Sequence, residues 1–360
     1  MRTFSPAKIL PAAAAAGALA LAPAGVATIA SGVAPPARAA APAAASWHLA
    51  FQVPGPNFPE FTAATATSGG SAWAFEVQGS KAPAAYQLSG STWSRRAFPA
   101  KAGDSVIAAS SSSARNVWAF TFQGQVLRFD GHSWAKVKKF SKSIGSGLAV
   151  STNDVWAFGP MGAGTWHFNG HGWARVASGT GLAGARALSA SSIWGYGGTN
   201  VAHWNGHTWA KTSVAALLPK NTLLSHSFVA GIYAASASSV HAIGSGGRQD
   251  EGGPLVLLHY NGSAWSRVAQ NKNLGGPVAI FPDGHGGLWI PVLTGFPGNG
   301  SMEHFAHGTL SSVALPISPP HLALFAGAIG KHTTAALAVG YKRKSFSAQT
   351  TTAVILRFGT

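Results

Sequence analysis

The sequence lacks cysteine altogether. Disulfide bonds, cysteine-ligated zinc, iron–sulfur clusters and thiol catalysis are therefore excluded. Acidic residues are scarce too, with nine Asp and Glu against 25 Lys and Arg, and charged residues make up only 9% of the chain. Neither the His-Glu-x-x-His motif of zinc proteases nor the Gly-x-Ser-x-Gly motif of α/β-hydrolases occurs. These absences leave few candidates for catalysis, and no metal or cofactor is predicted.

Long apolar runs are missing everywhere except near the N-terminus. There, Arg2 and Lys8 precede an apolar stretch over residues 9–30, and an Ala-x-Ala site ends at Ala39. This order is typical of a secretory signal peptide, which we predict over residues 1–39. A membrane anchor is the alternative, but proline and glycine interrupt the stretch and alanine is only weakly apolar. No later segment reaches 18 consecutive apolar residues, so no other membrane span is predicted.

The predicted mature protein begins at Ala40 or Ala41, with a short linker over residues 40–45. We expect it outside the cell, either free or associated with the cell wall. The net charge of the whole chain is +16, and removal of the signal leaves 22 basic residues against nine acidic ones, a net charge of +13. Such an excess favours anionic partners, of which an acidic polysaccharide or wall polymer is predicted and a specific nucleic acid is not. The alternative is a spread of charge that only keeps the protein soluble as a monomer.

Glycine and aromatic residues are abundant, with 45 Gly, 19 Phe and 13 Trp in a chain that is 46% hydrophobic. Such a chain buries a sizeable core, and glycine-rich turns with aromatic residues favour many short strands over long helices. An internal repeat combines a Val-Trp-Ala-Phe-like strand with an aromatic residue, Asn-Gly or a related turn, and a closing Trp. The clearer copies span residues 73–93, 116–134, 154–173, 193–209 and 240–265, and a weaker copy spans residues 288–308.

Each copy has the pattern of four strands. The first is apolar with small residues, the second contains the repeated Trp, the third ends before Asn-Gly, and the fourth carries the closing Trp. Asn-Gly between two strands predicts a two-residue type I′ hairpin, which would pair Trp204 with His207. Strand alternation then places Trp204 and Trp209 on one face and His203 on the other. Four-strand units of about 40–50 residues match the blades of a β-propeller.

The seventh copy is divided between the two ends of the chain. Residues 355–359 have the pattern of a third strand, and residues 46–49, Ser-Trp-His-Leu, resemble the missing fourth strand. We therefore predict an all-β fold, with a single seven-bladed β-propeller over residues 46–360 whose last blade is closed by the mature N-terminal strand. Six blades are the alternative, if the weak copy is an insertion.

These repeats resemble those of exported actinobacterial β-propeller proteins, which are built from Val-Trp-Ala-Phe-Gly and His-Trp-Asn-Gly-x-x-Trp. They are more loosely similar to Kelch and Asp-box propellers. The resemblance covers nearly all of residues 46–360. It implies the fold but no particular function, since propellers carry many unrelated activities.

Histidine recurs at one repeat position, in His167, His203, His259 and His304. Zinc ligands must all lie within about 2.0–2.2 Å of one ion. Equivalent positions in different blades are too far apart for that, so we predict structural roles for these side chains.

The loops between second and third strands and the links between blades vary in length, and in a propeller both sets emerge on one face. The varied loops include residues 245–254, 294–302 and 342–351. Such loops on a rigid scaffold often carry recognition, so we predict a ligand-binding face there with Arg248, Lys342, Arg343 and Lys344 as its basic residues. The predicted function is a secreted, non-enzymatic binding or scaffold propeller for an anionic wall polymer or glycan. The alternative is a propeller-type carbohydrate-active hydrolase or lyase.

Overall fold

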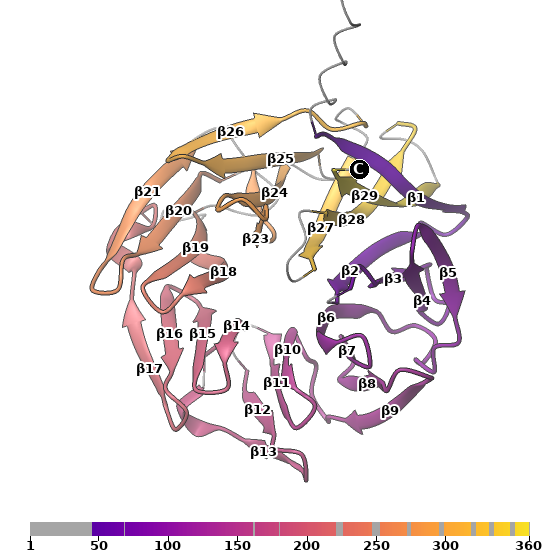
Figure 1. The fold of residues 1–360 in the computed structure, drawn as a ribbon, viewed down its shortest axis with the longest axis horizontal. Coiled ribbons are helices and arrows are strands. Elements are labelled where there is room, and N and C mark those ends of the chain that lie inside the picture. The colour runs from indigo at the N-terminus through magenta and orange to yellow at the C-terminus, as the bar shows by residue number, and fades with distance from the viewer. Residues whose placement is uncertain are drawn as a thin grey trace, which may run out of the picture. The chain divides into compact units, whose positions relative to one another are not determined.

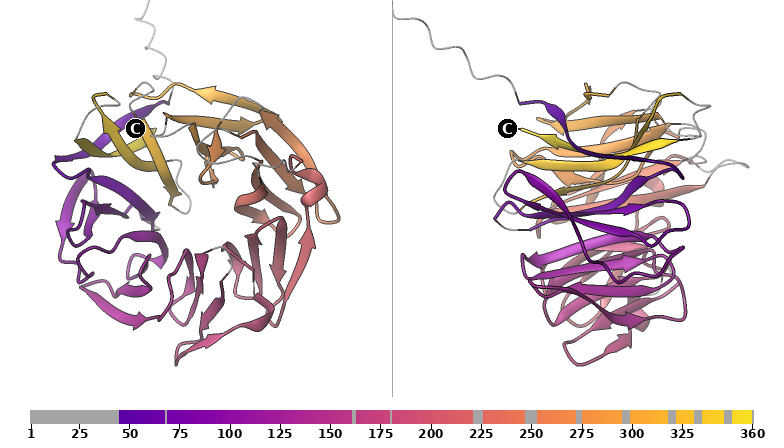
Figure 2. Two further views of the ribbon diagram at one scale, coloured as in Figure 1. Left: turned by 180° about the vertical axis from the view of Figure 1, so that it is seen from behind. Right: turned by 90° about the vertical axis from the view of Figure 1, so that its right-hand side faces the viewer.

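The computed structural model describes residues 45–360, apart from 68, 161–162, 180, 221–225, 247–252, 272–274, 295–298, 318–321, 331–334, 346–349 and 360. Ala44–Thr360 form one compact unit, separate from Met1–Ala43. Within it, the described strands form seven antiparallel sheets arranged around a common centre (Figure 1). The view from behind in Figure 2 shows the same ring. The fold is therefore a seven-bladed β-propeller, as predicted.

The first four blades follow one another along the chain. Blade 1 contains β2 (Glu60–Ala66), β3 (Ala72–Val77), β4 (Ala84–Ser89) and β5 (Thr92–Arg96). Blade 2 contains β6 (Val106–Ser113), β7 (Asn116–Thr121), β8 (Gln125–Phe129) and β9 (Trp134–Lys139). Blade 3 contains β10 (Ser146–Ser151), β11 (Asp154–Phe158), β12 (Thr165–Phe168) and β13 (Trp173–Arg175). Blade 4 contains β14 (Gly184–Ser189), β15 (Ser192–Gly197), β16 (Asn200–Trp204) and β17 (Trp209–Ser213).

The last three blades complete the ring. Blade 5 contains β18 (Ser227–Ser236), β19 (Ser239–Gly246), β20 (Leu255–Tyr260) and β21 (Trp265–Asn271). Blade 6 contains β22 (Gly276–Pro277), β24 (Leu288–Thr294), β25 (Asn299–Ala306) and β26 (Thr309–Val313), and β23 (Phe281–Pro282) also pairs with β24. Blade 7 contains β27 (Leu322–Ile329), β28 (Ala336–Arg343), β29 (Thr351–Phe358) and β1 (Trp47–Gly55). Two short 3₁₀ helices, η2 (Ala177–Gly179) and η3 (Ala215–Leu217), lie in links between blades.

The N-terminal strand closes the ring, as the sequence predicted. β1 pairs with β29 in antiparallel register, with Trp47 opposite Phe358 and Leu49 opposite Leu356. The seventh sheet therefore contains both ends of the described chain. Because β1 covers the outer edge of β29, the last blade gains the same four strands as the others.

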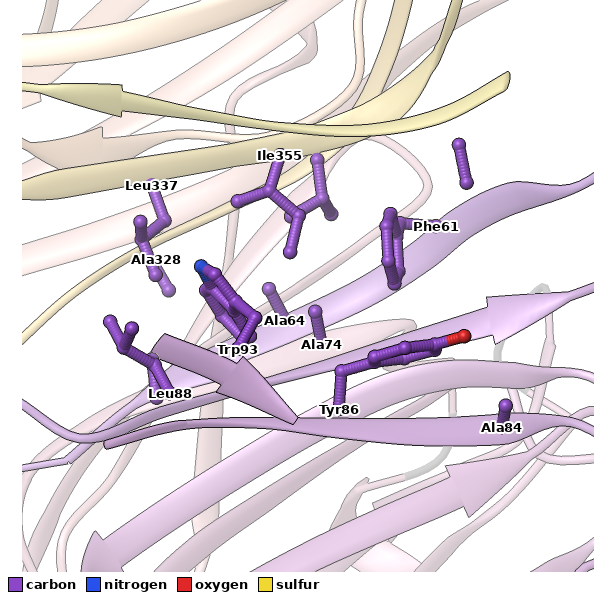
Figure 3. Packing of buried hydrophobic residues seen from close by; sticks show 13 residues of the cluster. Phe61, Ala64, Ala74, Ala84, Tyr86, Leu88, Trp93, Ala328, Leu337 and Ile355 are labelled. Carbon is purple, nitrogen blue, oxygen red and sulfur yellow. The ribbon is translucent and has the colours of Figure 1, made fainter. Parts of the chain in front are cut away.

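The core lies between the blades rather than inside any one of them. Successive residues of a strand point to opposite faces of its sheet. In β11, Trp156 packs in a cluster with blade 4, whereas Val155 and Ala157 pack in a cluster with blade 2. Figure 3 shows the same arrangement where blade 7 meets blade 1, with Ile355 and Trp93 in one buried cluster. Because blades bury both faces, the short strands need apolar residues at nearly every position.

The first strands need small residues because the second-strand aromatics of neighbouring blades reach them. A side chain at Gly147 of β10 would place its Cβ 2.2 Å from the ring of Phe120 in β7. This contact is much shorter than van der Waals separation, so only glycine fits there. Blade 6 departs from the pattern, since its first strand is split into β22 and β23, each of which ends in a proline that cannot donate a hydrogen bond. This split explains why the sixth repeat is weak in the sequence.

The predicted two-residue hairpins are wrong in register. Trp204 pairs with Trp209, so the loop between β16 and β17 has four residues. The Asn205 side chain accepts hydrogen bonds from the backbone N–H groups of His207 and Thr208, and only Gly206, at φ +97°, needs a positive φ. The predicted faces still hold, because directly paired Trp204 and Trp209 lie on the same side of the sheet.

Candidate functional site

The topology divides the loops between two faces of the ring. Neighbouring strands are antiparallel, so the loops between second and third strands and the links between blades emerge together, on what we call the variable face. The other turns emerge on the opposite side, the turn face. The predicted loops at 245–254, 294–302 and 342–351 belong to the variable face, although their central residues lie outside the described part of the chain.

Exposed lysines gather on the variable face. The described loops and links of this face carry Lys81, Lys101, Lys142, Lys220 and Lys344, all of them exposed. In the described turns of the turn face, Arg115 is the single Lys or Arg. The positive charge of the loops is therefore one-sided.

Most of the described acidic residues are buried and so contribute little to the exposed charge. Four are buried, namely Glu76, Asp104, Asp283 and Glu303. Burial raises the pKa of Glu303, whose carboxylate accepts hydrogen bonds from the hydroxyls of Ser301 and Ser312. Asp130 lies on the turn face, where the backbone N–H groups of Ser133 and His132 lower its pKa. Two of the buried acids lie near this face: burial raises the pKa of Glu76 while Arg95 and Lys81 oppose that rise, and Asp104 lies in the same link as Lys101. Because both carboxyls are buried, the exposed charge of the described loops is mainly positive.

Three of the four predicted site residues lie together in blade 7. Lys342 and Arg343 end β28, and Lys344 follows at the variable face. The guanidinium carbon of Arg343 lies 5.9 Å from the centroid of the Tyr341 ring, which holds it against the blade. Arg248 lies outside the described residues.

A second basic corner, which the sequence-based prediction did not include, lies on blade 2. Lys139 ends β9 and donates a hydrogen bond to the carbonyl of Gln123, and Lys142 follows in the link to blade 3. Phe122, in the loop between β7 and β8, is 53% exposed beside them. An exposed aromatic ring with two lysines is suited to an acidic sugar, whose ring stacks while its charge is paired. The sequence signal for this corner is the run of Lys138, Lys139 and Lys142.

The recurring histidines have structural partners, as predicted. Each packs on a ring of the second strand and contacts a polar side chain, which begins the second strand in blades 3, 4 and 5 and lies in the turn before it in blade 6. His167 lies 4.2 Å from the Trp156 ring centroid and 2.9 Å from Asp154 Oδ1, and His304 lies 2.8 Å from Asp283 Oδ2. The same role belongs to His203 with Ser192 and His259 with Ser239. Among the described residues, no group of three His, Asp or Glu side chains is placed to hold a metal ion.

The central channel is lined by the first strands, with one equivalent position in every blade. These seven residues each pair with the residue that occupies the repeated Trp position. They are Thr65, Ser110, Leu148, Arg186, Tyr233, Phe281 and Ala328. Arg186 is the one charged member of this set, and all seven line the same cavity. Sequence reasoning missed it, although an arginine inside a first strand of small residues was a visible signal.

The channel holds two connected hollows. The larger, toward the turn face, has a volume of about 810 Å³, and the smaller, toward the variable face, has about 210 Å³. Their walls share Ala64, Ala109, Arg186, Ile280 and Gly327, so Arg186 lies at the junction. No Asp or Glu occurs among the described residues that line either hollow. The described channel wall therefore lacks the pair of carboxylates that a glycosidase needs.

No protein-family model and no curated protein matches the sequence. Solved propellers match the structure over most of its length. YCF48 bound to D1 peptide is 13% identical, with a TM-score of 0.61, over 87% of this chain and 97% of that chain. A catalytically inactive virginiamycin B lyase from Staphylococcus aureus with quinupristin is 11% identical, with a TM-score of 0.60, over 88% and 100%. The WD40 propeller domain of Doa1 is 7% identical, with a TM-score of 0.58, over 88% and 97%.

At these identities the similarity shows the fold alone. The class that the fold defines is the β-propeller, with WD40 propellers among its structural neighbours. The finer resemblance to actinobacterial and Kelch repeats is not supported by a sequence match. Among the described residues, no helix has the length and apolar character that crossing a membrane requires.

Proposed function

We propose that this chain is an exported, non-enzymatic binding propeller that attaches to an anionic cell-wall polymer or acidic glycan through its variable face. The observation that carries the proposal is the one-sided charge of the described loops, with five exposed lysines on that face against Arg115 in the described turns of the other. Of the predicted residues, Lys342 and Arg343 end β28 and Lys344 follows them at the same face, whereas Arg248 lies outside the described residues. Export rests on the signal-like segment at residues 1–39.

The spacing of the lysines favours a polymer over a compact ligand. They come from loops and links of several blades, so one small anion reaches few of them, whereas an extended polyanion meets many. Each exposed ion pair contributes only about 0–1 kcal/mol, and affinity comes from their number. Such binding weakens with salt, since the Debye length falls from about 10 Å at 0.1 M to about 3 Å at 1 M.

A scaffold that presents loops to a macromolecule also agrees with one structural neighbour, YCF48, which was solved with a bound peptide. For the alternative of a glycoside hydrolase, the described channel wall offers no acidic residue. For the alternative of a lyase, the wall offers His241 and Tyr233, and His241 is packed against His259 and Phe305. We therefore propose binding rather than catalysis.

The test is sedimentation of the mature protein with purified Gram-positive cell walls at 0.1 M and 1 M salt. The variable-face variant changes five lysines to Gln, namely Lys81, Lys101, Lys142, Lys220 and Lys344. A control removes two exposed charges that lie off the variable face, Arg115 in a turn of the turn face and Lys136 within β9, also to Gln. It is compared with a double variant of Lys101 and Lys142 to Gln, which loses the same net charge.

We expect the wild-type protein and the control to bind at 0.1 M salt and the variable-face variant to lose most binding. A further variant, with Arg248, Lys342, Arg343 and Lys344 changed to Gln, tests how much of the binding comes from blade 7 and from the loop between β19 and β20 in blade 5. Equal loss in the double variant and the control would mean that only total charge matters. Binding that is unchanged at 1 M salt would refute the electrostatic basis.

A further inference from the structure

Arg186 carries an uncompensated charge inside the ring. Among the described residues it has no hydrogen-bond or ion-pair partner, and no acid lines the channel beside it. The side chain is exposed to the channel rather than packed into a blade. Protein atoms nevertheless surround it and lower the pKa of its guanidinium, although the nearby Tyr196 hydroxyl opposes this shift. An arginine that lines a channel and has no charged partner beside it can pair with the anionic group of a ligand.

A tyrosine lies in the channel wall near the guanidinium. Tyr196 of β15 pairs with Gly184 of β14, two residues before Arg186. A Cβ at Gly184 would lie 2.7 Å from the Tyr196 hydroxyl oxygen, so the glycine makes space for this ring. Tyr196 and Arg186 both line the smaller hollow. A ligand carboxylate at the junction can therefore accept two hydrogen bonds from the Arg186 guanidinium, with the Tyr196 hydroxyl nearby.

The larger hollow offers hydroxyl groups on one side and an apolar patch on another. Thr65 and Ser111 share a hydrogen bond of 3.1 Å between their hydroxyls. Ser110 and Ser112 lie on the same wall, where they accept hydrogen bonds from the Ala149 N–H and the Asn116 amide and keep their own O–H groups to donate to a ligand. Leu188, two residues beyond Arg186 in β14, is 37% exposed in this hollow. The volume of about 810 Å³ lies within the range of about 300–1,000 Å³ that is usual for small-molecule sites.

We propose that the channel binds a small molecule with one carboxylate and several hydroxyl groups, which is the chemistry of a uronic acid, and that Arg186 holds the carboxylate. One charged residue in seven equivalent positions suits one anionic group, whereas a polyanion would need repeated cations. Arginine binds carboxylates through two parallel hydrogen bonds. The serine and threonine hydroxyls then face the sugar hydroxyls, and Leu188 contacts the ring carbons. This site is separate from the lysines of the variable face.

The test is calorimetric titration of the mature protein with D-glucuronate, with D-glucose and acetate as controls. D-Glucose lacks the carboxylate, and acetate lacks the hydroxyls. We expect glucuronate to bind more tightly than either. Arg186→Met keeps the length of the side chain without its charge and should weaken glucuronate binding about 10- to 100-fold. Arg115→Met removes the same charge on the turn face and should bind as the wild type does.

A measurement on the wild-type protein covers the case in which Arg186→Met does not fold. Phenylglyoxal modifies accessible arginines, and peptide mass spectrometry reports the rate at each one. Glucuronate should slow modification of Arg186 and leave Arg115 unchanged. Equal affinity for glucose and glucuronate, equal affinity in Arg186→Met, or unprotected Arg186 would overturn the proposal. Cell-wall binding by Arg186→Met should stay at the wild-type level, so the two proposals fail independently.

Discussion

Removal of the Trp47 side chain should strongly destabilise the closed ring. The residue is 4% exposed, and its indole contacts Trp289 and Phe358 at ring-centroid distances of 5.3 and 5.6 Å. Its N–H has no hydrogen-bond partner among the described residues, so Trp47→Ala loses packing rather than polar contacts. Truncation of a buried Trp costs about 3–5 kcal/mol, and two aromatic contacts favour the upper part of that range.

The assay is urea unfolding followed by circular dichroism, which gives the free energy of unfolding. His48→Ala is the matched control, because His48 is the next residue of β1 and is exposed. It should change the free energy by less than about 0.5 kcal/mol. Deletion of residues 46–55 should cost more than Trp47→Ala, since it also uncovers the edge of β29. If Trp47→Ala is as stable as His48→Ala, the N-terminal strand does not close the ring and the reasoning fails.

Three further predictions follow from burial, packing and export. Burial, with the nearby His259, lowers the pKa of His241 to about 4. Between about pH 6.5 and 4 the unfolded chain therefore binds a proton that the folded protein does not, so the melting temperature should fall as the pH is lowered through that window. The fall should be smaller in His241→Phe. Gly147→Ala should lower the free energy of unfolding in urea by about 1–3 kcal/mol, because the added methyl group meets the buried Phe120 ring. Gly172→Ala is the control and should change this free energy little, because its methyl group meets nothing within 4 Å. N-terminal sequencing of the secreted product should start at residue 40 or 41, and an intact N-terminus in a membrane fraction would contradict export.

The fold was predictable because several independent signals agree along the chain. The repeated Trp, the turn residues and the closing Trp recur in the same order, and residues 46–49 match the strand that the last copy lacks. The hairpin register was not predictable from Asn-Gly alone. In the structure, the Asn205 side chain accepts hydrogen bonds from two backbone N–H groups, and the loop has four residues rather than two. This side-chain bonding competes with the two-residue turn that Asn-Gly usually indicates.

The candidate sites were less predictable because they depend on which strand ends and strand faces meet in space. The lysines of the variable face lie far apart in the sequence, and only the ring brings their loops to one side. Arg186 occupies the position that is Thr65 in blade 1 and Ser110 in blade 2, and its neighbours across the channel come from other blades. The inward direction of Glu303 and Asp283 was hidden for the same reason.

The most direct test of the account is hydrogen exchange of the mature protein with and without a soluble anionic wall polymer. Binding through the variable face predicts slower exchange in its loops and links, especially at residues 78–83, 97–105 and 140–145. The turns at residues 130–133 and 205–208 should exchange at the same rate in both samples. Protection of the turn face, or no protection on the variable face when the polymer is bound, would contradict the central claim.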